Sequence, residues 1–168
     1  MRTSATIIGV LAACVAVPAA AQPSGQCADI GTPAKNIALA KGFYQAFASH
    51  AKDQLDSVLV ADWIDVPMAP GQKPGLAGMK AAMDGYYASF PDFTPTNDDF
   101  IASGDKVVVR STITATQRGA FAGVAATGKS ISVMAIDIHR ICNGRIAETW
   151  HVEDWLSGLF QMGGLPRR

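Results

Sequence analysis

Apolar residues in the first third of the chain recur with the spacing of an α-helix. Between residues 33 and 50 they stand three or four positions apart and therefore share one helical face: Ile37, Ala40, Phe43, Tyr44 and Phe47. Thr32 and Pro33 suit the N-cap and the first helical position of this segment. Similar patterns predict a second, short helix over residues 54–60 and a third helix over residues 76–90.

From Phe93 onward the apolar period shortens to about two, which is the period of a β-strand. The segments expected from this pattern are a short strand over residues 62–67, long strands over 94–102 and 106–118, a hairpin over 129–154 and a closing helix over 155–162. Helices precede the long strands without βαβ alternation. The pattern therefore predicts an α+β domain, with three N-terminal helices packed on one face of a curved antiparallel sheet and a short C-terminal helix.

The hairpin over residues 129–154 contains the most informative side chains. Its first strand places Asp137 in the middle of an apolar run, where a carboxyl group costs free energy unless it is paired, hydrogen-bonded or used in chemistry. Its second strand ends in aromatic and ionisable residues that include Trp150 and His151. This hairpin is therefore the first place to look for a functional site.

The turn of the hairpin decides whether Asp137 and His151 share a face of the sheet. A two-residue turn at Asn143 and Gly144 would place them on opposite faces, because side chains alternate along a strand. A three-residue turn that begins at Cys142, or a bulge in the last strand, would place them on the same face. We expect the three-residue turn.

The composition fits one globular domain and argues against two classes of ligand. The 168 residues are 49% hydrophobic, and 14 basic and 14 acidic residues are interspersed along the chain. Nucleic-acid binding is not expected, because no basic stripe is present to meet a phosphate backbone. The 3 histidines lack the spacing of metal ligands, so no metal site is expected either.

The N-terminus predicts export. Arg2, an apolar run and small residues before Gln22 match a secretory signal peptide over residues 1–21. The apolar run is too short to span a bilayer comfortably, so we expect no membrane span and a periplasmic or secreted protein. A lipoprotein cleavage site with a lipidated Cys14 is the alternative.

Removal of the signal peptide leaves two cysteines, Cys27 and Cys142. Cys27 lies in a polar arm, residues 22–31, which we expect to be flexible ahead of a domain over residues 32–168. A pair of cysteines in an exported protein favours a disulfide, and two unpaired thiols are the alternative. A bridge closing so long a loop would stabilise the fold by ~4 kcal/mol in the chain-entropy account.

Several short motifs carry a resemblance to a known family. They are FPDF at 90–93, GDKVVVR at 104–110, TGK at 127–129, IDIHRI at 136–141, NGRI at 143–146 and ETWH at 148–151. In this order and spacing they resemble the SnoaL-like polyketide cyclase (ester cyclase) family of the NTF2-like superfamily. The resemblance extends from about residue 36 to the C-terminus.

The resemblance implies an NTF2-like cone, in which the helices and a bent sheet enclose a deep apolar pocket. Cyclases of this family close a polyketide ring by an intramolecular aldol condensation without a metal or cofactor, using a carboxylate and a histidine on the last two strands. Here His151 and Asp137 occupy those positions, with the two residue types exchanged. Val66 stands where many relatives carry a histidine, with Asp65 beside it.

We therefore expect cofactor-independent acid–base chemistry, an aldol cyclisation or an isomerisation, on a small hydrophobic carbonyl compound, with Asp137 and His151 as the catalytic pair. His139 lies nearer the turn and is expected to be solvated. The other expected pocket residues are Tyr44, Trp63, Asp65, Met83, Tyr87, Phe121, Met134 and Trp150. The fold class also implies a homodimer through the open face of the sheet.

Three alternatives remain open on the residues alone. Asp137 and His151 would hold the hairpin in register if they only bond each other as satisfied buried polar groups. An NTF2-like module that binds a small ligand or a partner protein without catalysis would need no such pair. Epoxide hydrolysis on the same fold would need a second carboxylate beside Asp137, with Asp65 and Asp99 as the candidates.

Overall fold

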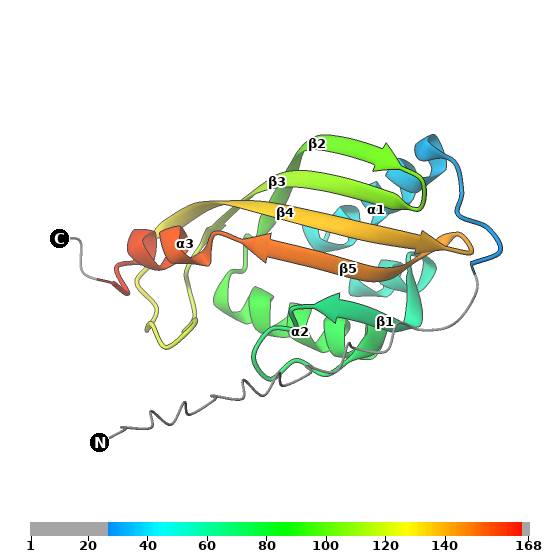
Figure 1. The fold of residues 1–168 in the computed structure, drawn as a ribbon. Coiled ribbons are helices and arrows are strands. Elements are labelled where there is room, and N and C mark those ends of the chain that lie inside the picture. Colours follow the sequence, from blue (N-terminus) through cyan, green and yellow to red (C-terminus); the bar gives the residue numbers. More distant parts are fainter. Residues whose placement is uncertain (1–26, 166–168) are drawn as a thin grey trace, which may run out of the picture.

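The computed structural model describes residues 27–165. The expected signal peptide, Cys14 and residues 22–26 of the arm lie outside this range. In chain order the elements are α1 (Pro33–Ala48), the 3-10 helix η1 (Lys52–Ser57), β1 (Leu59–Val66), α2 (Gly75–Ser89), β2 (Thr94–Ser103), β3 (Lys106–Thr116), β4 (Ser130–Cys142), β5 (Arg145–Glu153) and α3 (Trp155–Met162). Helices and strands thus follow the predicted order, in an α+β fold (Figure 1).

The strands form one five-stranded sheet in the order β1-β5-β4-β3-β2. Strands β2, β3, β4 and β5 pair with one another in the antiparallel direction, as predicted. Strand β1 is instead parallel to β5, so the prediction of a purely antiparallel sheet is wrong. The two strands are far apart in sequence, and no local turn constrains the direction in which they pair.

The second predicted helix is also different in the structure. It is a single 3-10 segment, and the backbone N–H of Val58 donates to Leu55 at 3.0 Å in the tighter i to i+3 pattern. The residues that follow, expected to extend the helix to position 60, begin β1 instead, and the carbonyl of Val58 accepts from Ile146. The β-branched Val60 favours this extended path.

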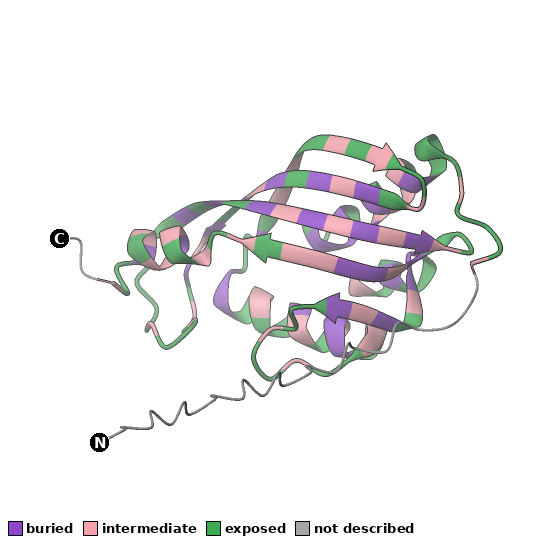
Figure 2. Cartoon of the chain, in the orientation of Figure 1, coloured by how far each residue is buried: buried purple, intermediate pink, exposed green. Residues whose placement is uncertain are grey.

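Within residues 27–165, helices cover only one face of the sheet. Helix α1 packs on β2 and β3, α2 packs on β1, and α3 packs on β4. In Figure 1, α1 lies behind β3 and β4, and the face toward the viewer carries no helix. The buried core lies between the helices and the sheet, and burial alternates along β3 and β4 as a strand with one covered face requires (Figure 2).

The uncovered face carries a row of apolar residues. One row of paired residues runs across all five strands: Ile101, Val108, Ile138, Trp150 and Val66. Val152 and Met134 extend it and are 65% and 52% exposed. Strand alternation dictates this arrangement, because the neighbouring positions of each strand point into the core.

The predicted disulfide joins Cys27 to Cys142, with their Cα atoms 5.1 Å apart. The backbone N–H groups of Ala28 and Asp29 both donate to Oδ1 of Asn143 at 3.1 Å. The segment that enters α1 is thereby attached to the tip of the β4–β5 hairpin. None of the helices within residues 27–165 is long and apolar enough to cross a membrane.

Candidate functional site

The turn between β4 and β5 has two residues. Asn143 and Gly144 have φ values of 50° and 73°, and Cys142 pairs with Arg145. Positive φ at both central positions is the geometry of a type I′ turn, which Asn-Gly favours strongly. The prediction of a three-residue turn is therefore wrong.

A two-residue turn alone would place Asp137 and His151 on opposite faces of the sheet, but a bulge in β5 returns them to the same face. Ile141 pairs with Ile146, but Arg140 pairs with Glu148, so Ala147 is an extra residue on β5. Beyond the bulge Asp137 lies directly opposite His151. Both side chains thus point to the helix-covered face, which was the other route considered for bringing them together.

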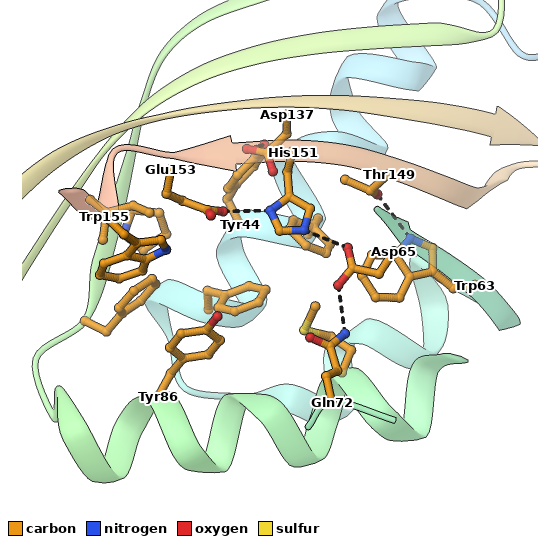
Figure 3. Close-up of a pocket in the computed structure, with 16 residues that line it drawn as sticks. Tyr44, Trp63, Asp65, Gln72, Tyr86, Asp137, Thr149, His151, Glu153 and Trp155 are labelled. Carbon is orange, nitrogen blue, oxygen red and sulfur yellow. Dashed lines mark hydrogen bonds and ion pairs between the residues drawn. The ribbon is translucent and has the colours of Figure 1, made fainter. Parts of the chain in front are cut away.

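The two side chains line an apolar pocket between the sheet, α1 and α2. The inner cavity has a volume of about 80 Å³, and aromatic residues supply much of its wall. A wider cleft of about 700 Å³ adjoins it, and both share Gln72, Tyr86, His151, Glu153 and Trp155. Figure 3 shows the polar groups gathered on the sheet side of the pocket, with Tyr86 reaching toward them from α2.

Asp137 is a buried carboxyl group with one hydrogen bond. The residue is 7% exposed, and the hydroxyl of Tyr44 donates to Oδ2 at 2.8 Å. Burial raises the pKa of Asp137 to about 6, although the Tyr44 hydrogen bond and the charge of His151 pull it down. The carboxyl group can therefore gain and lose a proton near neutral pH.

His151 is held as a cation between two acids. Its Nδ1 lies 2.9 Å from Oε1 of Glu153, and its Nε2 lies 3.1 Å from Oδ1 of Asp65 and 3.0 Å from the carbonyl oxygen of Pro67. Burial disfavours the charged ring, but the hydrogen bonds to Asp65 and Glu153 outweigh it and raise the pKa of His151 to about 10. Gln72 in turn donates to Oδ2 of Asp65 at 2.7 Å.

One atom from each of Asp137, His151 and Glu153 lies within 4.8 Å of the other two, a spacing that a metal ion could bridge. Both ring nitrogens of His151 already face carboxylate oxygens, however, and an imidazolium has no lone pair for a metal. In this state the cluster is an ion-pair network, and its positive charge lies beside Asp137.

His139 is buried rather than solvated, which corrects the expectation from its position near the turn. It is 0% exposed, because β4 continues under α1 and the ring packs against Phe43. Its Nε2 lies 3.0 Å from the hydroxyl of Tyr44, and its Nδ1 lies 3.0 Å from Oγ1 of Thr149. Burial lowers the pKa of His139 to about 3, so the ring is neutral.

Half of the expected pocket residues line the site. Tyr44, Trp63 and Asp65 line the inner cavity together with Asp137 and His151, and Phe121 lines the outer cleft. The pocket thus draws on α1, β1, β4, β5 and the loop before β4. The epoxide-hydrolysis alternative loses one candidate, because Asp99 is exposed on β2 and lines neither cavity.

The other four expected pocket residues lie elsewhere. Met83 is fully buried in the core between α2 and the sheet. The ring of Tyr87 stacks on His50, and its hydroxyl donates to the carbonyl of Phe47. Met134 and Trp150 point to the uncovered face, because Met134 lies three residues before Asp137 and Trp150 one residue before His151, and an odd offset reverses the face of a strand.

Several pocket residues were not expected from the sequence. Tyr86 replaces Tyr87, since adjacent residues on a helix point in directions about 100° apart. Glu153 lies two residues after His151, and the strand period of two places both side chains on the same face of β5. Gln72 comes from a Pro/Gly loop with no periodic pattern. The remaining wall is formed by Phe43, Phe47, Met79, Phe93, Pro95, Ile113, Thr149 and Trp155.

Solved structures share this fold. TsrD from Streptomyces laurentii has 32% sequence identity and a TM-score of 0.75, with 80% of this chain and 99% of TsrD covered. AclR from Streptomyces galilaeus, a proposed hydroxylase, has 26% identity and a TM-score of 0.71, covering 82% of this chain and 86% of AclR. Wild-type IdmH from Streptomyces antibioticus, a proposed polyketide cyclase, has 28% identity and a TM-score of 0.66, covering 79% of this chain and 99% of IdmH.

Comparison of the sequence with known families agrees with the structural similarities. A search of curated proteins found no match. The profile of the SnoaL-like polyketide cyclases, in contrast, matches residues 38–162, which include every helix and strand from α1 to α3 at least in part. The chain therefore belongs to the SnoaL-like polyketide cyclase family, as its motifs predicted.

Proposed function

We propose that this protein is a cofactor-independent acid–base enzyme that removes a proton next to a carbonyl group of a small hydrophobic compound and thereby drives an aldol cyclisation or an isomerisation. The observation that carries the proposal is Asp137, a carboxyl group in an apolar pocket whose pKa is raised to about 6 beside a fixed cation. A general base works best when its pKa lies near the working pH.

The roles follow from the hydrogen bonds of each group. Oδ2 of Asp137 accepts from Tyr44, and Oδ1 takes part in no hydrogen bond within residues 27–165, so Oδ1 is the atom that accepts the substrate proton. His151 supplies a positive charge nearby. Burial raises the pKa of Tyr86 to about 12, so its hydroxyl stays protonated and suits donation to a carbonyl oxygen.

The reaction then balances without a cofactor. The C–H proton moves to Asp137, and the electron pair becomes an enolate whose oxygen is stabilised by Tyr86 and by the charge of His151. In a cyclisation the enolate carbon attacks a second carbonyl of the same molecule, and the new alkoxide takes the proton back from Asp137. In an isomerisation the proton returns to a different carbon.

A bicyclic ketone, β-tetralone, offers a direct test because its protons next to the carbonyl exchange with solvent through an enolate. In D₂O, NMR should record their replacement by deuterium faster with the protein than with buffer alone. Saturable binding of β-tetralone without faster exchange would refute the enzyme and favour a small-ligand-binding module, the alternative that uses the same pocket.

The rate of protein-dependent exchange is expected to depend on pH with a defined sign. Asp137 accepts a proton only when ionised, so the rate should rise from about pH 5, reach half its maximum near the pKa of about 6, and then stay level to about pH 8. No fall is expected in that range, because the pKa of His151 is about 10 and its ring stays charged. A rate that falls with rising pH would contradict Asp137 as the base.

We further propose that the uncovered sheet face joins two copies of the chain. The apolar row across the five strands supports this, together with Val152, which is 65% exposed. The variant Val152→Glu should convert a dimer into a monomer in light scattering after size exclusion, because a buried unpaired carboxylate is costly at an interface. The control Ala38→Glu places the same charge on an exposed position of α1 and should leave the dimer intact. A parent protein that is monomeric at tens of micromolar contradicts the proposal.

We also propose that the protein is exported after removal of residues 1–21. The bond between Cys27 and Cys142 supports this location, because disulfides persist in oxidising compartments and are rare in reducing ones.

A further inference from the structure

We propose that a buried chain of side chains behind Asp137 is a one-way hydrogen-bond relay that keeps this carboxyl group ready to accept a proton. Its members, from the far end, are Trp63, Thr149, His139 and Tyr44. In this proposal Thr149 and His139 are positioning residues, which act on the reaction only through Asp137. The inference deepens the proposed function and rests on it for its catalytic meaning.

The four links are continuous and short. Nε1 of Trp63 lies 3.1 Å from Oγ1 of Thr149, which lies 3.0 Å from Nδ1 of His139. Nε2 of His139 lies 3.0 Å from the hydroxyl of Tyr44, and that hydroxyl lies 2.8 Å from Oδ2 of Asp137. Every member is at least nine-tenths buried, so water does not compete for these groups. Figure 3 shows the first link, from Trp63 on β1 to Thr149 on β5, and Tyr44 close to Asp137.

The far end of the chain sets its direction. The indole N–H of Trp63 can only donate, so it occupies a lone pair of the Thr149 oxygen. The hydroxyl proton of Thr149 then points to Nδ1 of His139. The neutral ring carries its proton on Nε2 and donates to the oxygen of Tyr44, whose own proton goes to Asp137. Each donor in this arrangement has one acceptor.

The reversed order of donors and acceptors is unfavourable because of Thr149. If Nδ1 of His139 carried the proton, Nε2 would accept from Tyr44, and Tyr44 could no longer donate to Asp137. Thr149 would then receive two N–H groups, and its own hydroxyl proton would have no acceptor within residues 27–165. A buried donor without a partner is costly, so the relay favours the arrangement that ends on an ionised Asp137.

The other ionisable groups around Asp137 act from different elements. His151 and Glu153 face it from β5 and Asp65 from β1, and their charges partly cancel. Tyr44 from α1 is the one hydrogen-bond donor to Asp137 within residues 27–165. The direction of the Tyr44 hydroxyl therefore affects how easily the buried carboxyl group ionises, and His139 sets the direction of that hydroxyl.

The first experiment determines the protonation state and tautomer of the His139 ring in the unchanged protein, and it requires no catalytic activity. Nitrogen-15 NMR of untagged protein should find His139 neutral and protonated on Nε2 at neutral pH, whereas His151 carries both ring protons. The variant His50→Gln removes the third histidine signal and completes the assignment. A His139 that is charged, or protonated on Nδ1, overturns the relay whether or not the protein is an enzyme.

The second experiment compares two substitutions at the middle of the chain. Thr149→Val removes the hydroxyl while keeping the shape, so Nδ1 of His139 loses its donor and the preference of the ring for protonation on Nε2 weakens. Tyr44 then divides its proton between Asp137 and His139. The midpoint of the Asp137 carboxyl titration, followed by carbon-13 NMR, should therefore rise by roughly half to one pH unit. Thr149→Ser keeps the hydroxyl and should leave the midpoint unchanged. Equal midpoints in the Val and Ser variants would overturn the relay.

The enzyme proposal and the relay proposal can be refuted independently of each other. The expected titration shift in a protein that does not accelerate β-tetralone exchange would support the relay and count against the enzyme alone. In an active protein, the midpoint of the pH–rate profile should move in Thr149→Val by the same amount as the carboxyl titration. A lower rate at every pH with an unmoved midpoint would mean that Thr149 is only structural, and would also overturn the relay.

Discussion

Asp137→Asn should lower the protein-dependent exchange of β-tetralone by at least about 100-fold, the usual contribution of a general base. The amide keeps the shape of the side chain and can still accept from Tyr44, but it cannot take up a proton at neutral pH. Exchange rates measured by NMR in D₂O at about pH 7.5 give the result. A variant that retains more than about half of the parent rate would end the proposal that Asp137 is the base.

The matched control is Asp99→Asn, the same chemical change at an exposed carboxylate on β2, and it should leave the rate unchanged. Thermal unfolding separates lost chemistry from lost folding. The pKa of Asp137 is raised from 3.8 to about 6 in the folded protein, so its contribution to stability is complete below about pH 3.8 and is lost as the pH rises through about 6. Asp137→Asn should therefore be at least as stable as the parent at pH 7.5.

Replacing both bridged cysteines, as Cys27→Ser with Cys142→Ser, should lower the free energy of unfolding by about 4 kcal/mol. The bridge spans a sequence separation of 115 residues, so its loss frees a long loop in the unfolded chain. It also releases the segment whose backbone donates to Asn143 at the hairpin turn. Urea unfolding of the parent and the double variant measures the difference.

Reduction of the parent by dithiothreitol is the internal control and should reproduce the unfolding curve of the double variant. The site itself should be affected less than the stability, because Asp137 and His151 lie several residues from the hairpin tip. Unfolding curves that coincide with and without reductant would show that the bridge adds nothing to stability.

The exchange of residue types between the last two strands has a simple structural consequence. The resemblance places an acid on β5 and a histidine on β4, and this chain carries them the other way round. Because Asp137 and His151 are directly opposed in the register, exchanging them leaves one acid and one imidazole side by side. Asp65, beside the position where relatives carry a further histidine, lies 3.1 Å from Nε2 of His151.

The sequence by itself determined the family, the α+β class, most helix and strand positions, and the pairing of Cys27 with Cys142. The helices and strands depend on local periodicity and on capping residues such as Thr32, which act over a few neighbouring residues. The family followed from the order of the motifs, and the disulfide from the two cysteines left after the signal peptide. The sequence also identified Asp137 correctly as a buried carboxyl group, because an acid in an apolar run needs a partner wherever the strand lies.

Only the tertiary structure decided which side chains meet. The bulge at Ala147 brings Asp137 and His151 to one face, and nothing local distinguishes a strand with one extra residue from a regular one. Parallel pairing of β1 with β5 places Asp65 and Trp63 beside the residues of β5 in the pocket, and the loop after β1 adds Gln72. The bond from Trp63 to Thr149 joins residues 86 positions apart, and its energy depends on how the whole core packs rather than on neighbouring residues.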